Sequence, residues 1–99
     1  MNERATIDPP VAREPRPVAD EPALFGKRLI VATQDPDTGI VQYVRDYRAA
    51  SEVFTEGGRA YVRIVPELNW YAWETDPNPD KTPAPPRARA YAAEFCWVE

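Results

Sequence analysis

The placement of proline limits which part of this chain can form continuous secondary structure. Five of the twelve prolines lie within residues 1–22 and five within residues 77–86, and proline both fixes φ and removes a backbone donor. These segments are also poor in large apolar side chains, so burial cannot offset the entropy of ordering them. The sequence therefore predicts a disordered arm at 1–22 and one small domain at 23–99, with a proline-rich connector at 77–86.

Charge and composition argue against several classes of protein. Sixteen acidic and twelve basic residues give a net charge of −4, so the chain has no positive field that would attract nucleic acid or an anionic membrane. Cys96 is the single cysteine; it permits no intramolecular disulfide and is predicted to be a small buried apolar residue. No apolar run reaches the roughly 18 residues of a membrane span, and we expect a cytoplasmic location.

The clearest local pattern is a β-hairpin in the first half of the domain. Residues 27–34 and 40–47 are rich in β-branched and aromatic side chains, and the turn sequence DPDTG separates them. Within that turn Pro36 presets φ, and Gly39 can adopt a positive φ at little cost. The pattern predicts two antiparallel strands joined by a turn in which Gly39 is left-handed.

Two more strands are predicted at 59–65 and 68–74. The second contains the aromatic stretch LNWYAWE, in which strand alternation points Trp70 to one face and both Tyr71 and Trp73 to the other. We expect the C-terminal segment to cover the Tyr71 and Trp73 face with Tyr91, Phe95 and Trp97, which the connector at 77–86 brings across. A partner, such as a second copy of the chain, is the alternative cover. The Trp70 face is expected to join the main core, with Leu68, Ala72, Val31, Val62 and Ile64.

Two segments fit more than one kind of element. Residues 47–55 can form a short helix that ends at the following glycines, or a short strand within 52–55. Residues 87–99 fit either period, and we favour a strand there. The predicted fold class is mainly β: a small antiparallel sheet or an open SH3-like barrel of four to six strands, with one short helix as an alternative near 47–55.

The sequence carries no motif that fixes a reaction. It contains no histidine, the side chain most used as a general base and as a metal ligand. It has no glycine-rich phosphate loop and only Cys96 as a thiolate ligand. We therefore predict a chain that is not an enzyme and has no metal and no cofactor. A histidine-free enzyme that uses Glu67 and Glu74 as paired carboxylates is kept as an alternative.

The functional prediction depends on aromatic and arginine side chains. Tryptophan, tyrosine and arginine dominate the hot spots of protein interfaces, and the stretch 59–73 concentrates all three. We predict a non-catalytic protein-interaction module or regulatory accessory protein that binds a protein partner, with a second copy of the chain as an alternative partner. A nucleic-acid-binding β module is the alternative function, disfavoured by the acidic net charge. The predicted partner-binding residues are Tyr61, Arg63, Tyr71 and Trp73.

Overall fold

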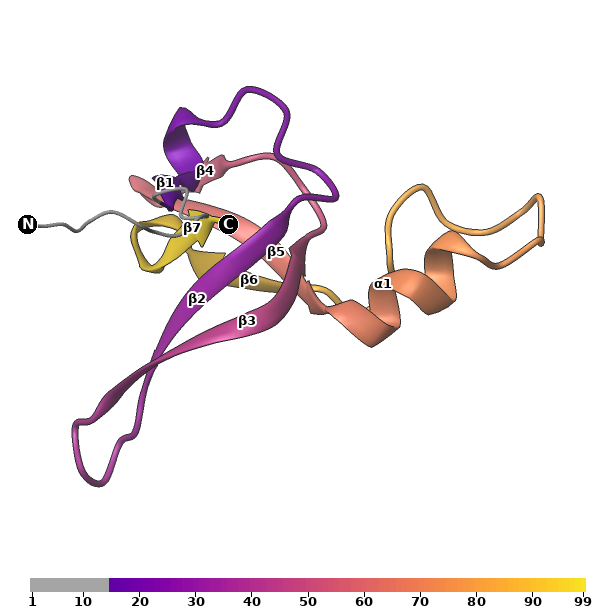
Figure 1. Ribbon diagram of the computed structural model, residues 1–99. Coiled ribbons are helices and arrows are strands. Elements are labelled where there is room, and N and C mark those ends of the chain that lie inside the picture. Colours follow the sequence, from indigo (N-terminus) through magenta and orange to yellow (C-terminus); the bar gives the residue numbers. More distant parts are fainter. Residues whose placement is uncertain (1–14) are drawn as a thin grey trace, which may run out of the picture.

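The computed structural model describes residues 15–99, which form one curled antiparallel sheet and one α-helix (Figure 1). The helix is α1 (Glu67–Glu74), and two short 3-10 helices are η2 (Val18–Asp20) and η3 (Ala93–Phe95). The strands are β1 (Arg16–Pro17), β2 (Arg28–Gln34), β3 (Val41–Ala49), β4 (Phe54–Glu56), β5 (Arg59–Pro66), β6 (Arg89–Ala92) and β7 (Cys96–Val98).

The sheet closes partly on itself. Its strand order is β1-β7-β2-β3-β5-β4, and β6 pairs with the other side of β5. The chain leaves β6, turns through η3 and returns as β7 beside β2, which curls the sheet into a half-barrel. This confirms the predicted mainly β class. The sheet has seven strands, because the N-terminal segment adds β1 and the C-terminal segment divides into β6 and β7.

The predicted hairpin is formed by β2 and β3. The main-chain nitrogen of Asp35 donates to the Ile40 oxygen at 2.9 Å, and the Asp35 carboxylate accepts from the Asp37 nitrogen at 2.8 Å. Gly39 has a φ of 75°, as predicted. Further along, the register shifts between the Leu29 and Val31 pairs, and such a bulge bends the strand that carries it. The bend helps β3 to pass from one half of the curled sheet to the other.

Replacing Gly39 with valine should destabilise the protein through the backbone alone. A Cβ at this position would meet only the Gln34 side chain, at 3.9 Å, so no steric clash contributes. A branched residue held at positive φ is strained by about 1 kcal/mol or more. We expect chemical denaturation of Gly39→Val to show a loss of that size and of Asp37→Ala to show almost none. Equal stabilities of Gly39→Val and the parent would contradict the turn geometry.

The interior consists of two apolar clusters. The larger one lies inside the curl and includes Val31, Val62 and Ile64, as predicted. Cys96 is also buried there, which confirms its prediction as a small core residue, and burial raises the pKa of its thiol to about 12. The smaller cluster contains Ala50, Val65 and Trp70 and connects α1 to the sheet.

The N-terminal segment contributes to the core, in contrast to the arm predicted for 1–22. The Val18 side chain is 1% exposed, and β1 pairs with β7 through Arg16 and Pro17. Val18 belongs to the larger cluster, together with Ala93 and Val98. The rest of the predicted arm, residues 1–14, lies outside the described residues.

Two predictions of secondary structure need correction or resolution. Residues 68–74, predicted as a strand, lie in helix α1. Pro66 ends β5 and precedes the helix with a φ of −58°, and proline is well suited to this junction because it needs no amide partner. The open question at 47–55 is resolved against the helix: β3 runs to Ala49, residues 50–53 are irregular, and the short strand β4 occupies Phe54–Glu56. None of the helices in the described part of the chain is long and apolar enough to cross a membrane.

Candidate protein-interaction site

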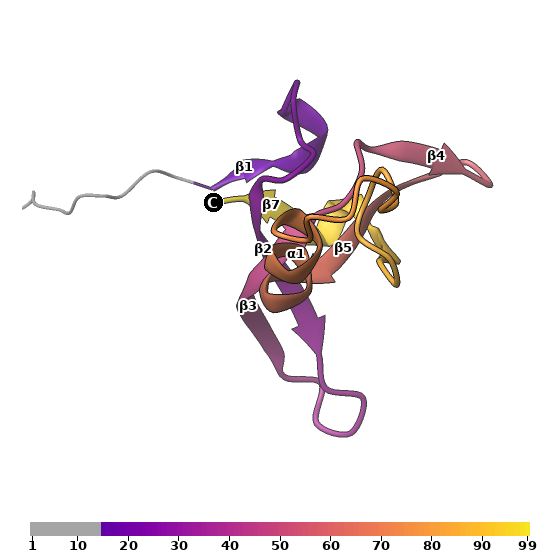
Figure 2. The same ribbon diagram turned by 90° about the vertical axis from the view of Figure 1, so that its right-hand side faces the viewer.

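Helix α1 extends away from the sheet, on the side opposite the β2–β3 hairpin (Figure 1). It follows directly from β5 and projects from the sheet, toward the viewer in Figure 2. Trp70 is 5% exposed, whereas Leu68 is 82% exposed. The helix is therefore apolar on two sides, and the sheet covers only one of them.

The inner face of α1 is an aromatic cluster. The Trp70 ring lies 5.2 Å from Phe25 and 5.1 Å from Trp73, measured between centroids. Its benzo edge lies against Gly26, where an added Cβ would meet it at 3.2 Å and where φ is 86°. Only glycine combines that conformation with such a close approach. The loop before β2 is thus shaped to receive Trp70.

The connector between α1 and β6 is fixed to the helix by two side chains. The Trp73 Nε1–H donates to the Thr82 oxygen at 2.8 Å. The Lys81 ammonium lies 4.8 Å from the centroid of the Trp73 ring and donates to the Trp73 and Glu74 oxygens at 2.9 and 3.0 Å. A lysine in this place satisfies free carbonyls at the C-terminal end of the helix and complements its dipole.

The prediction that the C-terminal aromatic residues cover Trp73 is therefore wrong. Trp73 is covered by Phe25, at a centroid distance of 6.1 Å, and by the connector residues Lys81 and Thr82. Tyr91 packs instead against the main core, and Trp97 lies 6.0 Å from Tyr43 on the hairpin. The C-terminal aromatics serve the sheet because β6 and β7 are integral strands of it.

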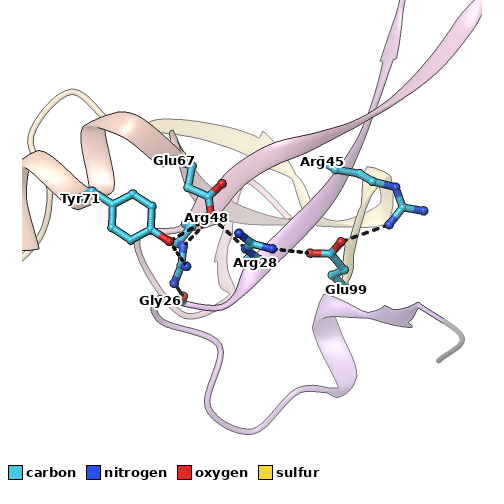
Figure 3. A network of polar contacts seen from close by, with 7 residues as sticks. All are labelled: Gly26, Arg28, Arg45, Arg48, Glu67, Tyr71 and Glu99. Carbon is cyan, nitrogen blue, oxygen red and sulfur yellow. Dashed lines mark hydrogen bonds and ion pairs between the residues drawn. The ribbon is translucent and has the colours of Figure 1, made fainter. Parts of the chain in front are cut away.

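A network of ion pairs surrounds the first turn of α1 (Figure 3). The Glu67 carboxylate accepts from Arg28 Nε at 2.8 Å and from Arg48 Nε at 3.3 Å. Arg28 also lies 3.9 Å from Glu99, whose other oxygen is 3.3 Å from Arg45. Basic groups from β2 and β3 thus neutralise one acid from the helix and one from the C-terminus.

The same network sets the ionisation of Glu67. Burial by itself raises the pKa of this carboxyl, but the hydrogen bonds and charges of Arg28 and Arg48 outweigh it and leave the pKa below its usual value. Glu67 is therefore ionised at neutral pH, as a structural anion between two guanidinium groups. A general acid or base works best with a pKa near the operating pH, which does not fit Glu67.

Arg48 fixes the orientation of Tyr71. Its Nη2 donates to the Tyr71 hydroxyl at 2.9 Å, its Nη1 donates to the Gly26 oxygen at 2.9 Å, and its guanidinium carbon lies 5.1 Å from the Tyr71 ring centroid. Tyr71 nevertheless remains exposed. It presents a rigid aromatic surface beside Leu68 on the outer side of the helix.

A cleft of about 500 Å³ separates α1 from the connector. Arg87 lines this cleft and has a φ of 67°, the single positive φ among the described non-glycine residues. No hydrogen bond or ion pair of its side chain occurs within residues 15–99. Backbone strain of this kind is frequent at functional sites. The lining residues are Asn69, Ala72, Trp73, Asp76, Lys81, Thr82, Pro86 and Arg87.

The four residues predicted to bind a partner fall in two places. Tyr71 and Trp73 lie on α1, whereas Tyr61 and Arg63 lie on β5 beside β4. The Arg63 guanidinium stacks 5.0 Å from the Phe54 ring centroid, and the Phe54 and Tyr61 rings are 6.0 Å apart. Arg63 therefore already covers an aromatic ring of its own sheet.

Sequence reasoning missed three residues of the α1 site: Arg48, Leu68 and Arg87. Leu68 was assigned to the core because strand alternation grouped it with Trp70. A helical reading would have separated them, since residues two apart lie on different sides of a helix. No sequence signal marks Arg48 or Arg87, because their positions depend on the path of β3 and of the connector.

Comparison with known proteins adds no relative: no protein family matches the chain, and neither a curated protein nor a solved structure is detectably similar to it.

Proposed function

We propose that this protein is a non-catalytic protein-interaction module, an accessory protein of the cytoplasm that binds a protein partner on the outer side of α1. The binding surface, called here the α1 surface, consists of Leu68, Tyr71 and Ala72, with the cleft that contains Arg87 beside it. The observation that carries the proposal is the exposure of Leu68, which is 82%. A large apolar side chain held on a fixed helix beside an exposed tyrosine is typical of an interface core.

Rigidity supports this assignment. Every side chain that becomes ordered on binding costs conformational entropy. A surface whose side chains are already ordered in the free protein therefore binds with a smaller entropic cost. Arg48 holds the ring of Tyr71, and the Trp70 and Trp73 cluster holds the helix beneath it. Tyrosine and arginine are also frequent among the residues that dominate binding energy.

The chemistry of the surface suggests the kind of partner. Leu68 and Ala72 offer apolar contact, and Arg87 offers a guanidinium without an acidic partner in the described chain. We therefore expect a protein segment that places an apolar side chain on Leu68 and a carboxylate in the cleft. The nucleic-acid alternative receives less support, because Arg59 is paired with Glu94 at 3.3 Å and Arg63 stacks on Phe54.

Leu68→Ser should weaken partner binding without affecting the fold. The partner is first captured from cells that naturally express the chain, and its affinity is then measured by calorimetry. Loss of a central apolar contact should raise the Kd by about tenfold or more, equivalent to about 1.4 kcal/mol. The melting temperature should hardly change, since the side chain contacts solvent in the free protein.

Phe95→Ser is the matched control. Phe95 is also an exposed apolar residue, but it lies in η3 and away from α1. Its substitution should leave the Kd as in the parent. If Leu68→Ser and Phe95→Ser bind the captured partner equally well, the α1 surface is not the binding site.

A further inference from the structure

The β2–β3 hairpin has one unpaired edge. β3 pairs with β5 only through Tyr47, Arg48 and Ala49, because β5 ends at Pro66 and the chain continues as α1. Within the described chain, the outer side of residues 41–46 therefore has no strand partner. Figure 1 shows this part of the hairpin extending beyond the sheet, away from α1.

The other edge of the hairpin is occupied as far as Ala32. On β2, Ile30 and Val31 pair with β7, and the next carbonyl, that of Ala32, accepts a hydrogen bond from the Tyr91 hydroxyl at 2.7 Å. Over residues 41–46, VQYVRD, β3 contains neither proline nor lysine; its charges and its bulge are confined to Arg45 and Asp46, which together lie opposite Ile30. Unpaired backbone groups along an edge strand are a template for another strand, and β5 leaves those of residues 41–44 unpaired.

Exposed apolar side chains accompany the open edge. Tyr43 is 64% exposed and Val41 is 48% exposed. Tyr43 lies 6.0 Å from Trp97, and together with Arg45 and Ile30 these two rings line a hollow of about 350 Å³. Tyr43 and Arg45 thus stand on the same face of the ribbon. A strand added to β3 would bury part of this face as well as pair the backbone.

We propose that β3 pairs edge to edge and antiparallel with β3 of a second copy of this chain, with Tyr43 opposite the partner's Arg45. Such pairing is two-fold symmetric, so every contact occurs twice. Val44 lies on the symmetry axis, opposite the partner's Val44.

In that register the side chains of one β3 edge are complementary to those of the same edge in the second copy. The Arg45 guanidinium meets an aromatic ring, a favourable cation–π pair, and no two like charges stand directly opposite each other, an arrangement that would be destabilising. Arg45 can do this because its contact with Glu99 uses only one of its amino groups, Nη1. The pairing joins two half-barrels into one continuous sheet and leaves the α1 surface free.

Two cysteine variants test the register. Residues opposite each other on a two-fold axis in a non-hydrogen-bonded pair have Cα atoms about 4.5 Å apart, within disulfide range. Val44→Cys should therefore form an intermolecular disulfide under mild oxidation at micromolar concentration. Gln42→Cys, which lies two residues from Val44 on the same face of the strand, should remain reduced. The native Cys96 should not interfere, because it is buried.

Analytical ultracentrifugation tests the association itself. We expect the parent to dimerise with rising concentration and Tyr43→Lys to raise the dimer Kd about tenfold or more, while the variant still unfolds in one cooperative transition. Leu68→Ser should dimerise as the parent does, which separates this inference from the proposed function. A parent that stays monomeric at millimolar concentration, or a disulfide at position 42 rather than 44, would overturn the proposal.

Discussion

A chain that ends at Asp80 is expected to lose its fold completely. The truncation removes β6, which pairs with β5, and β7, which pairs with both β1 and β2. It also removes three residues of the main core, Ala93, Cys96 and Val98. Without β7 the half-barrel cannot close, and the remaining apolar face of the sheet is exposed. A domain of this size has about 5–15 kcal/mol of stability in total, which is too little to absorb such a loss.

Circular dichroism and sedimentation provide the measurement for this truncation. We expect the near-ultraviolet signal of the tryptophans to vanish and the truncated chain to aggregate. The matched control is deletion of residues 1–14, which leaves every described contact in place and should retain the cooperative transition. A truncated chain that stays monomeric and unfolds cooperatively would show that β6 and β7 are dispensable, against the pairing seen here.

Replacing Trp70 with alanine is expected to be the most damaging single substitution in the smaller cluster. The ring is 5% exposed and contacts Phe25, Gly26 and Trp73. Truncation of a buried tryptophan to alanine costs about 3–5 kcal/mol, from lost burial and from the cavity left behind. Because this cluster connects α1 to the sheet, the helix should detach and partner binding on the α1 surface should fall with it.

Trp70→Phe should be much milder. The Trp70 Nε1–H is buried and has no hydrogen-bond partner among the described residues, and such an unpaired donor costs about 1–3 kcal/mol. Phenylalanine removes that donor while retaining most of the aromatic contact. We expect urea denaturation to show a loss for Trp70→Phe that is less than half of that for Trp70→Ala. Equal losses for the two variants would mean that the indole nitrogen makes a contact that stabilises the fold.

The stability of this protein thus depends partly on segments whose composition, taken alone, predicts little ordered structure. The N-terminal residues up to 22 and the connector at 77–86 are rich in proline, and the sequence predicted little structure in the first of them. Val18 and Thr82 nevertheless hold defined positions, one in the main core and the other as acceptor for Trp73. Each role belongs to a single residue, and a single residue leaves no periodic pattern in a sequence.

The sequence by itself determined the elements whose causes are local. The turn from Asp35 to Gly39 is specified by its own residues, since the Asp35 side chain and the positive φ of Gly39 close it without help from elsewhere. The period of two in β2, β3 and β5 likewise predicted these strands and the mainly β fold. The buried character of Cys96 followed from its chemistry and lack of a partner thiol.

Only the tertiary structure decided between helix and strand after Pro66, and with it the candidate site. Residues 67–74 satisfy both periods, because Trp70 groups with Leu68 and Ala72 in a strand and with Trp73 in a helix. The helix is stabilised by Phe25 and Gly26 from the loop before β2, and by Lys81 from the connector. Those contacts come from distant parts of the chain, so no local pattern could reveal that Leu68 would face solvent or that the edge of β3 would stay open.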